Sequence, residues 1–284
     1  MIYVSSSCSK QKRIGHAIRE LAEYGFKNIE LSGGTDFYEG YEEDLFSLKE
    51  KYHLNYLVHN YFPPPKEDFV FNLASLDDAI FERSLEQLRK AIRLAHLLGA
   101  NKFAFHAGFY MDISADEIGK AIPAYNLWDR KQSCERFCNG FNLIKSESKK
   151  VEIYIENNVY SKTNFNIYGR QNPFMLTSPD EYKELQQHID FKLLLDVAHL
   201  YVSSQTLGFD FDSYLEQMTM ETDYIHLSDN DGYHDQNAAF TSNSKLLNKI
   251  RKKYLKGKTV TLEIYTGIDG LKASFDYIAA MVDN

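Results

Sequence analysis

The sequence predicts an α/β protein that forms a single closed (β/α)8 barrel, and three observations support this fold class. Short apolar runs alternate with longer segments of helical periodicity along the whole chain, which is typical of parallel strands covered on both faces. Eight such runs can be counted, and the length of 284 residues is close to that of a one-domain barrel. An open doubly wound sheet is the weaker alternative, because no glycine-rich dinucleotide fingerprint follows the first strand.

The expected strands share a high content of Ile, Val, Leu, Phe and Tyr. They are Ile2–Ser5, Asn28–Leu31, Asn55–His59, Lys102–His106, Val151–Glu156, Phe191–Asp196, Asp223–Leu227 and Thr259–Ile264. No linker rich in Pro, Ser or Gly divides them, so we expect one domain over residues 1–284. Its functional site is then expected at the C-terminal ends of the strands.

The expected helices have apolar residues every three to four positions, and Gly25 and Gly99 follow two of them as C-terminal signals. They are Ile14–Tyr24, Asp77–Leu98, Cys134–Ser146, Phe211–Met220, Ser244–Tyr254 and Leu271–Val282. Ser114 and Ser178 are expected to start further helices, because a Glu follows each of them three residues later. Pro63–Pro65 and Tyr160–Thr177 are expected to be loops at the rim of the site.

The composition excludes several classes of protein. The chain carries 32 basic and 40 acidic side chains, and this net charge of −8 argues against a protein that coats nucleic acid. No apolar run approaches the length of a membrane span, and the first residues do not have the pattern of a secretion signal. Because the three cysteines cannot all pair, we expect reduced thiols and a cytoplasmic location.

Carboxylates and imidazoles recur where the expected strands end. The residues at or just beyond these ends are His59, His106, Glu156, Asp196, His199, His226, Asp229 and Glu263. An unpaired buried carboxylate is costly, so a compensating cation is expected, and this donor set suits Mn, Zn, Co or Mg. We expect one to three divalent ions. The histidines away from strand ends are expected to be structural: His16, His53, His96 and His188.

Six short motifs occur in an order that resembles the xylose isomerase-like TIM barrels, a superfamily of sugar phosphate isomerases and epimerases and of family 2 apurinic endonucleases. They are Val58-His59, Phe105-His106-Ala107-Gly108, Ile155-Glu156-Asn157, Leu195-Asp196-Val197-Ala198-His199, Ile225-His226-Leu227-Ser228-Asp229 and Leu262-Glu263. The resemblance covers nearly the whole chain. It implies Glu156, Asp196, His226 and Glu263 as the ligands of one divalent metal. His199 matches a second metal ligand in the endonuclease branch and a substrate-contacting residue in the isomerase branch.

The first hypothesis is a sugar or sugar-phosphate isomerase or epimerase, whose partner is a small molecule. A metal would polarise the substrate carbonyl, and Glu156 and Glu263 would remove and return a proton through an enediolate. Four aromatic residues are candidates for the walls of the sugar pocket: Tyr61, Trp128, Tyr160 and Tyr265. Simple packing is an equally good explanation for each of them. A sugar-binding barrel without activity is a minor third hypothesis.

The second hypothesis is a zinc-dependent endonuclease that hydrolyses DNA at abasic sites. His59 and His106 match positions that complete a multi-zinc cluster in that branch, and His199, Asp229 and His234 are further candidates for a second metal or for substrate. Against it, the branch has an Asp-x-His pair followed by Gly-Glu-Gly, whereas here Asp231 and His234 are three apart and no such turn follows. We therefore favour the isomerase hypothesis.

Overall fold

Eight parallel strands close into a barrel in the computed structural model, which describes residues 1–117 and 120–283. Each strand pairs with the next in sequence, and β8 pairs with β1, so the expected topology is confirmed. The strands are β1 (Ile2–Ser5), β2 (Asn28–Leu31), β3 (Asn55–His59), β4 (Lys102–His106), β5 (Glu152–Glu156), β6 (Lys192–Asp196), β7 (Tyr224–Leu227) and β8 (Thr259–Leu262).

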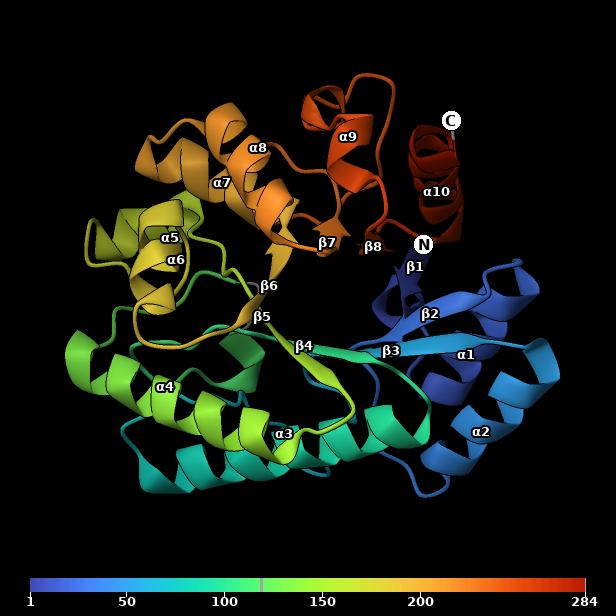
Figure 1. The fold of residues 1–284 in the computed structure, drawn as a ribbon, viewed down its shortest axis with the longest axis horizontal. Helices are drawn as coiled ribbons and strands as arrows, with labels where there is room; N and C mark the ends of the chain where they lie inside the picture. The colour runs from blue at the N-terminus through green and yellow to red at the C-terminus, as the bar shows by residue number, and fades with distance from the viewer. Residues whose placement is uncertain (118–119, 284) are drawn as a thin grey trace.

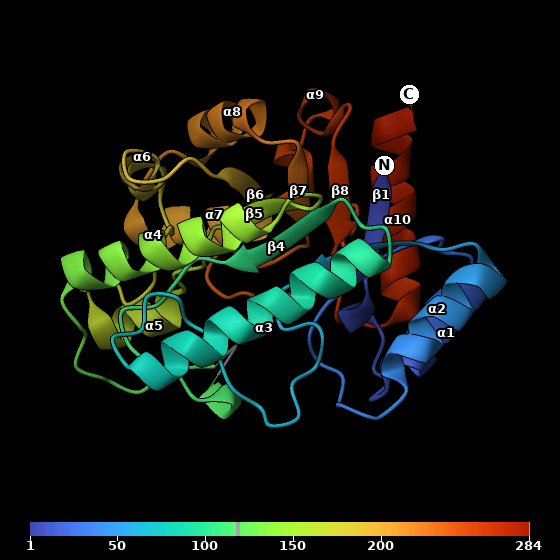
Figure 2. The same cartoon turned by 60° about the horizontal axis from the view of Figure 1, so that its bottom comes forward.

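Helices surround the strands on all sides (Figure 1). They are α1 (Ile14–Glu23), α2 (Tyr41–Tyr52), α3 (Asp78–Leu97), α4 (Arg130–Glu147), α5 (Lys162–Tyr168), α6 (Pro179–Gln186), α7 (Val197–Leu207), α8 (Phe211–Glu221), α9 (Lys252–Leu255) and α10 (Ile268–Asp283). Figures 1 and 2 show α3 and α4 side by side along one flank, and α10 beside β8 and β1, where the two termini lie. None of the described helices is long and apolar enough to cross a membrane.

The main core lies between the barrel and its helices. Ile14, Ile18 and Leu21 recur at helical spacing on α1 and are fully buried, as are Phe137 and Phe141 on α4. Each such side chain contributes about 1.5–3 kcal/mol when it leaves water. The strands are buried on both faces, which explains why their sequences are apolar almost without interruption. The three cysteines are free, as expected.

The helix ends follow local capping rules. The Asp77 side chain accepts hydrogen bonds from the N–H groups of Ala79 and Ile80, so α3 begins at the residue after it. At α6, the Ser178 hydroxyl accepts from the Glu181 N–H, as the sequence predicts. The expected helix at Cys134 begins four residues earlier, because Asp129 provides its N-cap.

Three local expectations need correction. Residues 244–254 form a 3-10 turn (Leu247–Lys249) and the short α9 instead of one helix, because the backbone is extended at Ile250 and Arg251. The expected loop Tyr160–Thr177 contains α5. Ser114 is followed only by the 3-10 turn Ala115–Glu117, and residues 118 and 119 lie outside the described part of the chain.

Candidate metal centre

The barrel brings the polar strand ends to one mouth. His106 and Glu156 are directly paired across β4 and β5, and Asp196 and His226 across β6 and β7, so each pair lies at the same level. Glu263 follows β8 directly, and its N–H donates to the carbonyl of Leu227 at 3.1 Å. Residues far apart in the sequence therefore face one another at the barrel mouth.

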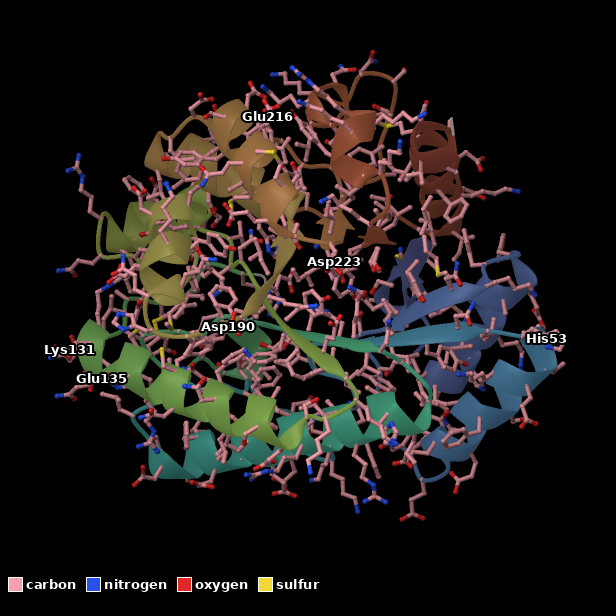
Figure 3. All side chains as sticks on the ribbon, in the orientation of Figure 1. His53, Lys131, Glu135, Asp190, Glu216 and Asp223 are labelled. Atoms are coloured by element: carbon pink, nitrogen blue, oxygen red, sulfur yellow. The ribbon has the colours of Figure 1, made fainter. Side chains whose placement is uncertain are left out.

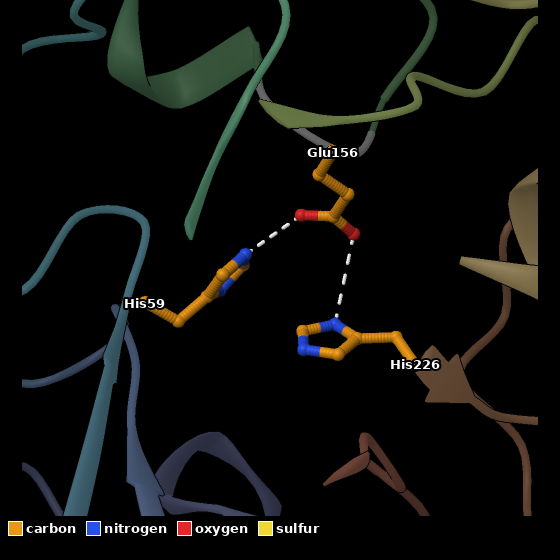
Figure 4. Close-up of side chains that lie close together, drawn as sticks. All are labelled: His59, Glu156 and His226. Carbon is orange, nitrogen blue, oxygen red and sulfur yellow. Dashed lines mark hydrogen bonds and ion pairs between the residues drawn. The ribbon is translucent and has the colours of Figure 1, made fainter. Parts of the chain in front are cut away.

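Glu156 is fully buried and is in contact with four histidines. Its Oε2 lies 2.7 Å from Nε2 of His59 and 3.3 Å from Nδ1 of His106. Its Oε1 lies 3.7 Å from Nδ1 of His199 and 3.6 Å from Nδ1 of His226. Figure 4 shows the His59 and His226 rings approaching this carboxylate from two sides. Each oxygen of the carboxylate thus faces two imidazole rings.

The two oxygens of Asp196 have different surroundings. Oδ1 accepts a hydrogen bond of 2.7 Å from the His199 N–H and so caps α7, whereas Oδ2 faces Nε2 of His199 at 3.9 Å. The Asn157 side chain accepts from the Asp196 N–H at 2.8 Å and donates to its carbonyl at 3.0 Å. The Asn157 carbonyl lies 2.8 Å from Nδ1 of His199, which leaves Nε2 to face Asp235 at 3.4 Å. Asn157 therefore positions both Asp196 and His199.

His226 lies between three carboxylates. Its Nδ1 is 3.6 Å from Oε1 of Glu156 and 3.6 Å from Oε2 of Glu263, whereas its Nε2 is 2.9 Å from Oε1 of Glu30. Burial opposes a charge on this ring, but Glu30 and Glu263 outweigh it and raise the pKa of His226 well above its usual value. The ring is fully buried.

Burial and neighbouring charges set the protonation of the other groups. Burial alone would raise the pKa of Glu156, but His106 and His59 hold it below its usual value. Burial lowers the pKa of His106 to about 4, so that ring is neutral at neutral pH and offers a lone pair. Burial raises the pKa of Asp196 to about 7, and the Glu156 charge adds to this effect.

Several buried atoms at the mouth have no hydrogen-bond partner within the described ranges. They are Oε1 of Glu156, Oδ2 of Asp196, Nδ1 of His106 and Nδ1 of His226. Leaving such atoms unpaired costs about 1–3 kcal/mol each, which a bound cation would offset. Ligand atoms of Asp196, His226 and Glu263 lie within 4.8 Å of one another, as do those of the His59, Glu156 and His226 group. This buried donor set fits a divalent cation.

A pocket of about 250 Å³ adjoins the cluster, with His106, His199 and Asp235 along one side. Tyr61, a candidate wall residue, is among the residues that line it. His234 also lines it but is half-exposed and bonds Asp231 at 2.8 Å. A second apolar cluster borders the pocket and is built from the connections after β3, β4 and β5: Val70, Met111, Ile113, Ile122, Tyr160 and Phe174.

Four other expected site residues lie outside this pocket. Trp128 lines a separate surface hollow, and Tyr160 is fully buried, with its hydroxyl donating to the Gly169 carbonyl at 2.6 Å. Tyr265 is 43% exposed, and its hydroxyl accepts from Ser7 at 3.3 Å. The Asp229 backbone pairs with Ala238, and its carboxylate accepts a hydrogen bond from Ser244. Of the histidines expected to be structural, His53 lies at the periphery, at the end of α2 (Figure 3).

A sequence model of one protein family, described as xylose isomerase-like TIM barrel, matches residues 18–281. The chain belongs to this family. Fructoselysine 3-epimerase from Shigella flexneri is 23% identical to this chain over 242 residues. The match spans 81% of this chain and 76% of the relative.

Solved structures of the same architecture resemble this xylose isomerase-like barrel over nearly its whole length. A D-tagatose 3-epimerase-like protein has a TM-score of 0.73 and 17% identity, and the match covers 99% of this chain and 96% of that one. Endonuclease IV from Thermus thermophilus has a TM-score of 0.62 and 16% identity, with 98% and 99% covered. At these identities the likeness shows a shared fold.

The structure also reveals three polar residues that the sequence reasoning missed: Glu30, Asn157 and Asp235. Glu30 could have been found from the sequence. It is a charged residue within a four-residue strand covered on both faces, and such a buried charge needs a partner. Asn157 directly follows a strand-end carboxylate, but its hydrogen bonds to β6 appear only once the barrel closes. Asp235 lies in a loop whose path no local pattern specifies.

Proposed function

We propose that this chain is a divalent-metal-dependent isomerase or epimerase of a sugar or sugar phosphate. The observation that carries the proposal is the arrangement of two buried carboxylates around one ring nitrogen. Oε1 of Glu156 and Oε2 of Glu263 each lie 3.6 Å from Nδ1 of His226, and they come from strand ends separated by β6 and β7. The similarity to a curated sugar epimerase agrees with this chemistry.

Glu156, Asp196, His226 and Glu263 would hold the cation, which when bound supplies the Lewis acidity that polarises a carbonyl. Burial acts to raise the pKa of Glu263, but the His226 charge outweighs it and holds that pKa below its usual value. Glu156 is shifted in the same direction, so both carboxylates are ionised at neutral pH and either can accept a proton from carbon. Isomerisation needs one carboxylate to carry a proton between neighbouring carbons. Epimerisation needs both: one carboxylate removes the proton and later releases it to solvent, and the other takes up a proton from solvent and delivers it to the opposite face of the same carbon.

Isotope exchange tests this proposal. The wild-type protein is incubated in D2O with Mn²⁺ or Co²⁺ and with D-tagatose, D-allulose, L-ribulose or their phosphate esters. Proton NMR then follows the loss of the signals next to the carbonyl. We expect exchange with at least one substrate, and we expect Glu263→Gln to abolish it while the circular dichroism spectrum stays unchanged. Glu135→Gln, the same chemical change on the exposed face of α4 (Figure 3), is the matched control. If the Glu263→Gln variant exchanged deuterium as fast as the wild type, Glu263 would not be a proton carrier.

A second candidate function is a zinc-dependent endonuclease acting at abasic DNA. It is supported by His59 and His106, which contact Oε2 of Glu156 in addition to the four proposed ligands and so offer donors for more than one ion. Against it, Lys120 is the only Lys or Arg among the described residues that line the pocket, whereas DNA binding depends on clustered basic groups. Three bound zinc ions together with incision of an abasic duplex would favour this function. One bound ion together with isotope exchange would favour the isomerase.

A further inference from the structure

Glu30 is the third residue of β2 and points into the barrel, where its side chain is fully buried. Its Oε2 accepts hydrogen bonds from the Tyr224 hydroxyl and, at 2.8 Å, from the Thr261 hydroxyl. Its Oε1 lies 2.9 Å from Nε2 of His226. This separation has the length of a hydrogen bond, although the angle at the ring N–H departs from ideal hydrogen-bond geometry. Glu30 is therefore connected to β7 and β8 at the level just below the candidate metal centre.

We propose that Glu30 is a positioning residue, which holds the His226 ring so that its proton sits on Nε2 and its Nδ1 lone pair faces the metal ligands. The inference rests on the proposed metal site. A neutral imidazole carries one proton, and the group that meets one nitrogen decides which nitrogen remains to bind a metal. Here a carboxylate meets Nε2, while Nδ1 faces Glu156 and Glu263. Metal-binding histidines in proteins are commonly oriented by such a carboxylate.

The contacts of Glu30 argue that it orients a ligand and is not itself a ligand. Both of its oxygens already face partners on the barrel interior, and Tyr224 and Thr261 fix the plane of its carboxylate. Its ligand atoms also lie within 4.8 Å of those of His59 and Glu263, so direct coordination is the competing role. The two roles predict different responses to Gln, which keeps an oxygen acceptor for the His226 N–H but is a poor ligand in place of a carboxylate.

The test compares Glu30→Gln and Glu30→Ala with the wild type, without any substrate. Metal-free protein is titrated with Co²⁺ in competition with a chelating dye, and the visible spectrum of the bound ion is recorded. We expect Glu30→Ala to bind about 10–100 times more weakly, the usual effect of losing such a partner, and Glu30→Gln to recover most of the affinity. Glu152→Gln and Glu152→Ala are the matched controls, because the Glu152 carboxylate lies at the opposite end of β5 and bonds Tyr154 and Lys192. Both should bind Co²⁺ as the wild type does.

A second readout is specific to ring orientation. Long-range ¹H–¹⁵N NMR of histidine-labelled, Zn²⁺-loaded protein distinguishes a protonated from a metal-bound ring nitrogen, and His226→Gln assigns the signal. We expect a protonated Nε2 and a bound Nδ1 in the wild type and in Glu30→Gln, and a changed pattern in Glu30→Ala. A bound Nε2 in the wild type, unchanged affinity in Glu30→Ala, or loss of affinity in Glu30→Gln as large as in Glu30→Ala would overturn the positioning role. A wild-type chain that binds no divalent ion would refute the proposed function as well.

Discussion

Replacing Asn157 by Ala should weaken both the fold and the metal site. The Asn157 side chain accepts from the Asp196 N–H at 2.8 Å and donates to its carbonyl at 3.0 Å, and both residues are buried. Removing the amide leaves that buried N–H without its partner, which costs about 1–3 kcal/mol of folding free energy. Asp196 also loses the group that fixes its backbone, so we expect divalent-ion affinity to fall by about 10–100-fold, as for other residues that orient ligands.

Asn72 offers a matched control for this experiment. It is equally buried, and its side chain also bonds to backbone groups, donating to the carbonyls of Phe109 and Met111 at 3.0 Å. Its hydrogen bonds within the described ranges involve no side chain of the metal centre, so Asn72→Ala should lower stability without lowering metal affinity. Urea unfolding in the presence of a chelator measures the first effect, and dye competition for Zn²⁺ measures the second. Wild-type metal affinity in Asn157→Ala, or an equal loss of affinity in Asn72→Ala, would refute the reasoning.

Two further predictions concern protonation and packing. Divalent-ion affinity should rise with pH through about 7, by up to about tenfold per pH unit, because a proton on Asp196 must leave before a cation binds. His226, whose pKa is raised, changes affinity in the same direction. Dye competition between about pH 5.5 and 8 measures the slope, and a flat profile in the wild type would contradict it. Phe141→Ala, in the core between α4 and the barrel, should lower the free energy of unfolding by about 3–5 kcal/mol in urea while the metal affinity of the folded protein is unchanged. A loss of unfolding free energy below about 1 kcal/mol would contradict this prediction and show that the core around Phe141 is loosely packed.

The barrel and the ends of its strands were predictable because both follow from local pattern. In β5, Ile153, Tyr154 and Ile155 lead directly to Glu156, so the C-terminal end of the strand is visible in the sequence alone. The helix expected over residues 244–254 failed because apolar spacing alone does not reveal an extended break at Ile250 and Arg251. Trp128 and Tyr160 were candidates for pocket walls as aromatic residues in the connections that follow β4 and β5. Long connections carry one to a separate surface hollow and the other into an apolar cluster.

The convergence of the candidate ligands at the barrel mouth was predictable, but the groups that contact them from other strands and loops were not. A ligand is recognised by its own position, whereas Glu30 matters because β2 and β7 face each other across the barrel interior. Asp235 depends in the same way on the path of the connection after β7, which brings it to His199. Such pairings arise only when the chain closes on itself, and a single sequence contains no direct signal for them.

Under the proposed function, Asp196 serves two purposes that an evolving chain cannot separate. Its Oδ1 starts α7 by accepting from the His199 N–H, while its Oδ2 faces the candidate metal centre. A descendant that had lost its chemistry would still keep this residue, since giving up an N-cap costs about 0.5–2 kcal/mol of stability. The Glu263 side chain has no such structural task, because among the described residues its ion-pair contact is with His226 alone. If Glu263 carries the proton transfer proposed above, retention of its equivalent in related barrels is a better indicator of that activity than retention of the aspartate.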